Sequence, residues 1–229
     1  MKQIFGLIPA AGIGARMRAD RPKQYLFLGS RTLLERSVDC LRADARVVRI
    51  FIVVARNDAI ATTLPLPACC EILVAGGATR AETVRNGLRV VKGVAANDDW
   101  ILVHDAARPC LQAAELAALI DNGGRDEHGA LLAIPLSDTV KRACEGRVQQ
   151  TVARTDLWRA LTPQFFRIDV LSQALEQSTD ATQITDEASA VESLGLKPHL
   201  IEGSAGNIKV TTADDLRLAE AVLRQQGRW

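Results

Sequence analysis

Small residues and cations that suit the binding of a polyphosphate occur together in one segment, PAAGIGARMRADRPKQY at positions 9–25. The small residues are Ala10, Ala11, Gly12 and Gly14, and they follow directly after an apolar run. Backbone N–H groups in such a loop can approach phosphate oxygens closely, and Arg16 and Lys23 add positive charge on either side. This combination would suit a phosphate-binding loop.

The segment is similar to two familiar nucleotide-binding motifs, but it matches neither of them. A dinucleotide fingerprint needs a third glycine where Met17 stands. A Walker loop would place Lys and then Ser or Thr directly after Gly14, which is followed by Ala15 and Arg16 instead. Spacing alone leaves two interpretations open: a different phosphate-binding loop, or an ordinary glycine-containing turn that carries two solvated cations.

A carboxylate and an arginine follow another apolar run, in the segment ILVHDAARP at positions 101–109. A strand that ends at His104 would deliver Asp105 to the carboxyl edge of the sheet, where open α/β proteins bind their ligands. Arg108 is then placed to receive an anion. Asp105 could hold Mg²⁺ or a substrate hydroxyl, or form a plain ion pair with Arg108, and we expect His104 to be a buried, hydrogen-bonded imidazole rather than a base.

Two further segments could complete such a site. NIKVTTADD at positions 207–215 places Lys209 just ahead of a helical pattern, although a lone lysine there carries no meaning. GGATRAETV at positions 76–84 offers a Gly76–Gly77 turn, which would let a flat ring approach the backbone, and the hydroxyl of Thr83. The alternative for this segment is an ordinary turn before a helix.

The composition excludes several classes of partner. The chain has 28 Lys and Arg against 27 Asp and Glu, a net charge of +1, so we expect neither nucleic acid nor a membrane surface as a partner. No apolar stretch approaches the length of about 18 residues that spans a bilayer. The five cysteines form no C-x-x-C pair, which favours reduced thiols and a cytoplasmic protein. Because the net charge is close to zero, any site for an anion must be formed by a local group of cations.

Short apolar runs alternate with helical patterns over the first part of the chain. The runs that predict buried strands are 3–8, 49–54, 71–74, 100–103 and 130–134. The patterns that predict helices are 33–41, 57–63, 81–91 and 113–120. This order predicts an α/β fold with three αβα layers, in which helices cover both faces of a largely parallel sheet.

The alternation stops after Pro135. Residues 137–152 contain too few apolar side chains to pack on a sheet, so they predict a protruding hairpin that turns at Glu145 and Gly146. The later elements predicted are helices at 168–177, after 185 and at 214–226, and a strand at 199–202. We expect a single domain over 1–229, with 137–154 as an arm.

In this order the motifs closely resemble those of the 2-C-methyl-D-erythritol 4-phosphate cytidylyltransferases, and the resemblance covers essentially the whole chain. The matching segments are PAAGIGARM, PKQY, GGATRAETV, ILVHDAARP, LTPQFF at 161–166, ITDEAS at 184–189 and NIKVT at 207–211. The resemblance implies a Rossmann-like nucleotidyltransferase that uses CTP and Mg²⁺, and a homodimer held by the protruding arm.

The resemblance also implies roles for single residues. It implies catalytic roles for Arg16, Lys23 and Lys209, and a CTP site lined by Ala10, Ala11, Gly12, Gly14, Gly77 and Thr83. It implies that methylerythritol phosphate is bound by Asp105, Arg108, Thr139, Arg154 and Thr162, with Thr139 and Arg154 reaching the site from the partner's arm. Position 83 is usually serine in the family, and Thr83 keeps the hydroxyl that would face cytosine while adding a methyl group.

The implied reaction is the attack of a methylerythritol phosphate oxygen on the α-phosphorus of CTP, which gives 4-diphosphocytidyl-2-C-methyl-D-erythritol and pyrophosphate. A phosphate monoester has a second pKa of about 6, so the nucleophile is already ionised at neutral pH and needs no general base. Three rival functions remain: a cytidylyltransferase for another polyol phosphate such as ribitol 5-phosphate, a nucleotide-sensing or scaffold protein that has lost turnover, and, less favoured, a NAD-binding oxidoreductase.

Overall fold

The computed structural model describes residues 2–12, 21–178 and 184–229. The strands are β1 (Ile4–Pro9), β2 (Phe27–Leu28), β3 (Arg31–Thr32), β4 (Val47–Val54), β5 (Cys70–Val74), β6 (Trp100–Val103), β7 (Ala130–Pro135), β8 (Val140–Cys144), β9 (Arg147–Val152), β10 (Trp158–Arg167) and β11 (His199–Glu202). The helices are α1 (Leu33–Arg42), α2 (Arg80–Val91), α3 (Ala113–Gly123), α4 (Ile168–Gln177), α5 (Glu187–Glu192) and α6 (Ala213–Gln225).

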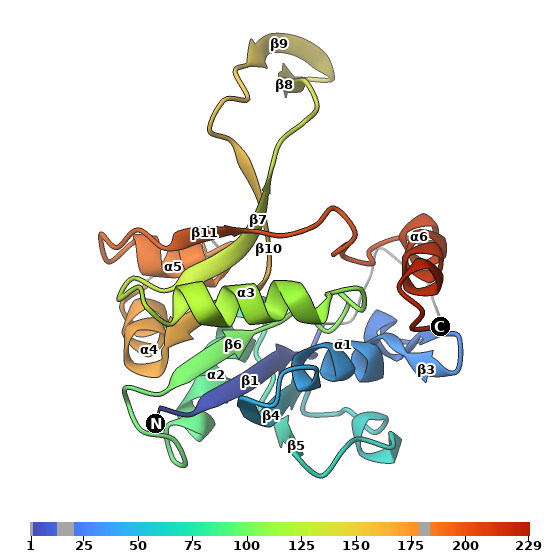
Figure 1. Cartoon of the computed structure of the whole chain (residues 1–229), viewed down its shortest axis with the longest axis vertical. Coiled ribbons are helices and arrows are strands. Elements are labelled where there is room, and N and C mark those ends of the chain that lie inside the picture. Colours follow the sequence, from blue (N-terminus) through green and yellow to red (C-terminus); the bar gives the residue numbers. More distant parts are fainter. Residues whose placement is uncertain (1, 13–20, 179–183) are drawn as a thin grey trace.

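A seven-stranded sheet with the order β11-β7-β10-β6-β1-β4-β5 forms the centre of the protein (Figure 1). Neighbouring strands are parallel except where β10 pairs antiparallel with β6 and β7. The predicted largely parallel sheet is thus confirmed. The sequence analysis missed β10 as a strand, because Thr162, Pro163 and Gln164 interrupt its apolar residues.

Helices cover both faces of this sheet, because the strands are apolar on both sides. Ile4 and Ile8 of β1 join the core under α1 and α3, whereas Phe5 and Leu7 join the core under α2, α4 and α5. Figure 1 shows α1 and α3 lying together on the near face. The predicted three-layer arrangement is therefore confirmed. None of the helices in the described part of the chain combines the length and the apolar composition that a membrane-spanning helix requires.

The helix predicted at 57–63 was wrong, since only a 3₁₀ turn at Ala61–Thr63 forms there. The carboxylate of Asp58 accepts hydrogen bonds from the backbone N–H groups of Ile60 and Ala61, at 3.0 and 2.9 Å. These are the bonds that an N-cap carboxylate makes, so they favour the start of a helical turn. The turn ends at once because Leu64 precedes Pro65, which disfavours the helical conformation, and Leu64 is extended. The segment consequently remains a loop beside β4.

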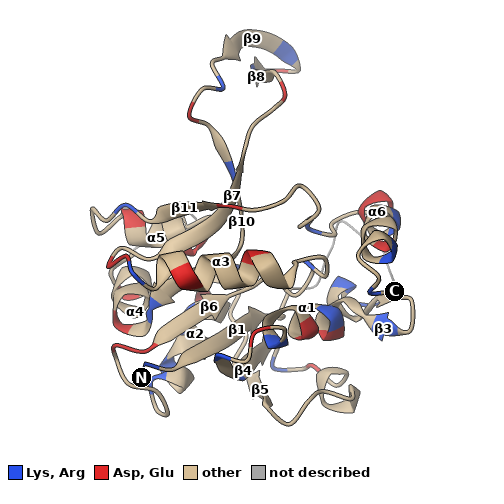
Figure 2. Cartoon of the chain, viewed as in Figure 1, with Lys and Arg blue, Asp and Glu red and all other residues tan. Residues whose placement is uncertain are grey.

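The β8–β9 hairpin stands away from the sheet (Figure 1), as the polar composition of 137–152 predicted. It turns at Glu145 and Gly146, whose φ angles of 49° and 76° give the tight turn that suits paired antiparallel strands. Every residue from 141 to 151 is exposed. Basic and acidic residues are interspersed here and on the other elements (Figure 2).

The order of the strands locates the ligand-binding edge of the sheet. From β1 the chain passes to β4 and β5 on one side, and then returns to place β6 on the other side. The strand order therefore reverses between β1 and β6, and ligands of open α/β sheets bind outside the carboxyl ends of the strands at such a point. Residues 10–12 follow β1, and His104 and Asp105 follow β6.

Candidate functional site

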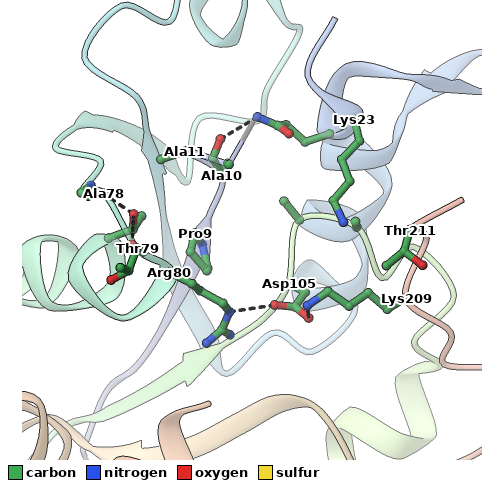
Figure 3. Close-up of a pocket in the computed structure, with 16 residues that line it drawn as sticks. Pro9, Ala10, Ala11, Lys23, Ala78, Thr79, Arg80, Asp105, Lys209 and Thr211 are labelled. Carbon is green, nitrogen blue, oxygen red and sulfur yellow. Dashed lines mark hydrogen bonds and ion pairs between the residues drawn. The ribbon is translucent and has the colours of Figure 1, made fainter. Parts of the chain in front are cut away.

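A cavity of about 570 Å³ opens at this edge of the sheet (Figure 3). Its lining comes from five segments, 9–12, 23–24, 77–83, 105–107 and 209–211. Its volume is in the range typical of sites for small ligands. The structure therefore brings together all four segments that the sequence analysis selected. Gly14 and Arg16 lie outside the described residues.

The turn at Gly76 and Gly77 packs closely against neighbouring residues beside the cavity, which Gly77 lines. A Cβ atom on Gly76 would lie 2.5 Å from the Cβ of Ala11, and one on Gly77 would lie 2.4 Å from the Cβ of Glu82. The backbone N–H of Gly77 donates to Oγ1 of Thr83 at 3.1 Å, and that hydroxyl donates to the backbone carbonyl of Thr79 at 2.9 Å. The hydroxyl of Thr83 thus fixes the turn from a buried position.

Hydrogen bonds fix the short segment that carries Lys23. The side-chain amide of Gln24 donates to the carbonyl of Ala10 at 2.7 Å, and the hydroxyl of Tyr25 donates to Asp58 at 2.5 Å. The ammonium group of Lys23 donates to the carbonyl of Val210 at 3.0 Å. Gln24 and Tyr25 were missed by the sequence analysis as supports of Lys23, although both belong to the PKQY motif that it quoted.

Asp105 is the centre of the charged groups in the cavity. Its Oδ1 lies 3.1 Å from Nε of Arg80, and its Oδ2 lies 2.9 Å from Nζ of Lys209 and 3.3 Å from Nε of Arg108. Burial by itself raises the pKa of Asp105, but the attraction of these cations outweighs burial and holds the pKa well below its usual value. The side chain of Asp105 is therefore ionised at neutral pH.

His104 is fully buried and hydrogen-bonded, as predicted. Its Nε2 lies 3.1 Å from the carbonyl oxygen of Arg108, which can only accept, so Nε2 carries the proton. Its Nδ1 lies 3.0 Å from Oγ1 of Thr162 and accepts from that hydroxyl. Burial lowers the pKa of His104 to about 4, so the imidazole is neutral at pH 7. These bonds assign His104 a supporting role beneath the site.

Arg80 and Glu187 contribute to the site, and the sequence analysis assigned neither of them a role. Nη1 and Nη2 of Arg80 donate to the two carboxylate oxygens of Glu187 at 2.6 and 3.0 Å. The side chain of Glu187 is 1% exposed. Both residues stand in quoted motifs, GGATRAETV and ITDEAS, but no local pattern indicates that residues so far apart in the chain form a pair.

The other predicted substrate-binding residues divide into two groups. Arg108 and Thr162 are buried beside Asp105: Arg108 donates to the carbonyl of Asn207 at 2.8 Å, and Oγ1 of Thr162 accepts from the backbone N–H of Asp105 at 3.0 Å. Thr139 and Arg154 are exposed on the arm, where the guanidinium of Arg154 donates to the carbonyl of Ser137. The single chain does not bring these two arm residues to the cavity lining.

A divalent cation would have one carboxylate to bind in this cavity. The described residues contain no group of three or more His, Cys, Asp or Glu side chains that could hold a metal ion. Asp105 is the one carboxylate among the described lining residues. Mg²⁺ is commonly held by one or two carboxylates together with substrate phosphates, and a carboxylate oxygen has room for a second contact. Asp105 fits a cation of that kind.

A switch-point cavity with a glycine wall, a small-residue loop and cations around one carboxylate defines an α/β enzyme of the nucleotidyltransferase class. A family model agrees and is more specific. Residues 4–225 match the family IspD: 2-C-methyl-D-erythritol 4-phosphate cytidylyltransferase. The chain belongs to this family.

Individual relatives are similar over nearly the whole chain. The chain is 51% identical over 226 residues to the 2-C-methyl-D-erythritol 4-phosphate cytidylyltransferase of Laribacter hongkongensis (strain HLHK9), and alignment covers 97% of each protein. It is 47% identical over 224 residues to the enzyme of that name from Haemophilus influenzae (strain PittEE), again covering 97% of each. A crystal structure of 4-diphosphocytidyl-2C-methyl-D-erythritol synthase, 42% identical, superposes with a TM-score of 0.84 over 97% of this chain and 99% of that one.

Proposed function

We propose that the protein transfers CMP from CTP to 2-C-methyl-D-erythritol 4-phosphate and releases pyrophosphate and 4-diphosphocytidyl-2-C-methyl-D-erythritol. The observation that carries this proposal is the meeting of Lys23, Lys209 and Asp105 at a cavity whose lining includes Gly77 of the glycine turn. Two polyanions must come together in this reaction, and a site with fixed cations and backbone N–H groups meets that need.

The proposed mechanism has no general base. The attacking phosphate has a second pKa of about 6, so most of it is a dianion at neutral pH. The nearest imidazole, His104, is neutral, buried and engaged on both ring nitrogens. Catalysis then depends on positioning and on the stabilisation of charge at the α-phosphorus.

Each side of the cavity receives one part of CTP in this proposal. Cytosine lies against the Gly76–Gly77 turn, whose geometry is fixed by Thr83. The phosphates lie against the backbone N–H groups of residues 10–12, a segment that follows β1 directly. Lys23 and Lys209 stabilise the transition state at the α-phosphorus, and we assign Arg16 to the departing pyrophosphate.

The second substrate requires residues from both the sheet edge and an arm. We assign Asp105, Arg108 and Thr162 to methylerythritol phosphate, in support of which they lie together beside the cavity. We assign Thr139 and Arg154 to the site of the neighbouring subunit of a homodimer. This assignment is supported by the exposure of residues 141–151 of the hairpin, including Val148 at 66%.

We also propose that the cofactor is Mg²⁺ and that the protein is located in the cytoplasm. When bound, the cation would neutralise phosphate charge, and Asp105 would hold it together with the substrate phosphates. The cytoplasmic assignment is supported by the five cysteines, all of which are free thiols.

Purified protein incubated with CTP, Mg²⁺ and each of two polyol phosphates tests the function. We expect pyrophosphate release with methylerythritol phosphate and at least tenfold lower kcat/KM with ribitol 5-phosphate, a ratio within what polar contacts to a substrate provide. The reverse preference would assign the protein to the other polyol. Binding of CTP without release of pyrophosphate would indicate a nucleotide sensor.

A further inference from the structure

We infer that Arg80 and Glu187 are positioning residues for the second substrate, because they fix the orientation of the Asp105 carboxylate. The inference rests on the proposed function, in which Asp105 contacts the polyol phosphate or its metal ion. Arg80 is the first residue of α2, Glu187 is the first residue of α5, and Asp105 follows β6. One guanidinium therefore connects three elements that are far apart in the sequence.

The geometry of Arg80 leaves its guanidinium little freedom. Two N–H groups meet both oxygens of Glu187, an arrangement that fixes the plane of the guanidinium as well as its place. The third contact, from Nε to Oδ1 of Asp105 at 3.1 Å, then has a defined direction. Figure 3 shows Arg80 and Lys209 reaching Asp105 from opposite sides. The carboxylate is held at both oxygens and cannot rotate freely.

Glu187 is suited to this role because it is isolated from water. Its side chain is 1% exposed, whereas that of Arg80 is 28% exposed and lines the cavity. A buried ion pair contributes little net stability compared with apolar packing, because both ions lose their hydration. Its clearest consequence is therefore orientation. Arg80 is held between two carboxylates, with Glu187 behind it and Asp105 in front.

The charge of the group explains why the orientation needs a second carboxylate. Asp105 faces three cations, Arg80, Arg108 and Lys209. Without the charge of Glu187, Arg80 would be free to turn fully onto Asp105. That movement would change how Asp105 meets the polyol phosphate, while the loop at 9–12 and the glycine turn would be unaffected. The effect should therefore be selective for one substrate.

The test is a pair of carboxylate-to-amide variants. Glu187→Gln keeps the size of the side chain and removes its charge. The matched control is Asp99→Asn, a 7%-exposed carboxylate at the opposite end of β6 that accepts from the backbone N–H groups of Gln3 and Ala96. Rates of pyrophosphate release would be measured while each substrate is varied in turn, together with the Tm of each variant.

For Glu187→Gln we expect kcat/KM for methylerythritol phosphate to fall on the order of tenfold or more, with KM for CTP changed by less than about twofold. For Asp99→Asn we expect kcat/KM for methylerythritol phosphate and KM for CTP to stay within about twofold of the wild-type values. This should hold even if Asp99→Asn lowers the Tm as much as Glu187→Gln does. A loss shared equally by both substrates, or no loss, would overturn the inference. A wild type that does not use methylerythritol phosphate would instead refute the proposed function, and the inference with it.

Two further variants keep the test decisive if Glu187→Gln does not fold. Arg80→Lys retains the positive charge but cannot contact both carboxylates in a fixed plane, so we expect the same selective loss. In a protein that already carries Asp105→Asn, Glu187→Gln or Arg80→Lys should lower kcat/KM for methylerythritol phosphate by less than a further factor of about two, because each residue acts through Asp105. Losses that multiply in full would show that Arg80 and Glu187 act independently of Asp105.

Discussion

Nζ of Lys209 lies 2.9 Å from Oδ2 of Asp105, although the two residues are separated by about half of the chain. Asp105 reaches this point because it follows β6, and Lys209 reaches it because the segment before α6 crosses the edge of the sheet. The backbone N–H of Val210 donates to the carbonyl of Ala107 at 2.8 Å, which fastens the two segments together. Their contact places a cation and an anion side by side in the cavity lining.

We expect Lys23→Ala and Lys209→Ala each to lower kcat on the order of a hundredfold or more, because each removes a cation from the developing charge at the α-phosphorus. The fold should persist, since Asp105 keeps Arg80 and Arg108 when Lys209 is removed. Pyrophosphate release would be followed beside the Tm, with the exposed Lys197→Ala as the control. Near-normal turnover in either variant would remove that lysine from the mechanism.

We expect the acid limb of kcat/KM to follow the ionisation of the substrate phosphate, with an apparent pKa of about 6. His104 has a pKa of about 4, too low to produce that limb. Replacement of His128 or His199 by Gln should therefore leave the limb in place. A His104→Gln variant that folds and binds both substrates, but loses the chemical step, would contradict the base-free mechanism.

His104 should make the free energy of unfolding depend on pH. The pKa of His104 in the folded protein is about 4, below the ordinary value of 6.5. Between pH 4 and 6.5 the imidazole is therefore protonated in the unfolded chain but neutral in the folded protein. The stabilisation is complete above pH 6.5 and falls as the pH drops to 4, by up to about 3 kcal/mol. Urea unfolding at several pH values should show a shallower acid slope for His104→Gln and an unchanged slope for the exposed His199→Gln.

The glycines of the cavity should respond differently to alanine. A Cβ on Gly76 would lie 2.5 Å from Ala11 and 2.8 Å from the carbonyl oxygen of Val54, so we expect Gly76→Ala to cost about 1–3 kcal/mol of stability. A Cβ on Gly12 would meet no described atom within 4 Å. Gly12→Ala should therefore keep the Tm but raise KM for CTP, because the new methyl group would stand between the backbone and the phosphates. Normal KM values in a stable Gly12→Ala variant would contradict the assigned phosphate loop.

Local patterns were sufficient to predict every strand of the central sheet except β10, and the position of the cavity. Strand ends can be recognised from apolar runs, and the carboxyl ends of parallel strands meet at one edge, so the sequence alone places Ala10 and Asp105 together. The pattern failed where local chemistry competed with it. Pro65 holds the preceding Leu64 extended and so stops the helix predicted at 57–63, and the polar residues of LTPQFF conceal a strand.

The ion pair of Arg80 and Glu187 could not be predicted in the same way. It joins residues 107 positions apart, and its partners become neighbours only when α2 and α5 pack on the same face of the sheet. Spacing carries no information about such a contact. The same limit applies to Gln24 and Ala10, whose hydrogen bond orients Lys23. Sequence patterns thus predicted the segments that line the cavity, but not the contacts between side chains of different segments.

The arm offers a test of the proposed shared site. Arg154 is exposed and its guanidinium contacts only Ser137 among the hydrogen bonds of the described residues. It can bind a phosphate tightly only if another surface fixes it. In a two-fold homodimer each arm would reach the neighbouring cavity, so Arg154 and Lys209 of one chain would serve different sites.

Arg154→Ala and Lys209→Ala would each be prepared as nearly inactive proteins, and then unfolded together and refolded as a mixture. If Arg154 serves the neighbouring site, a mixed dimer has one site with both lesions and one with neither, so about a quarter of all sites should regain full activity when pairing is random. If Arg154 serves its own chain, every site keeps one lesion and no activity returns. Native mass spectrometry would establish that mixed dimers are present, and an inactive mixture that contains them would remove Arg154 from the partner's half of the site.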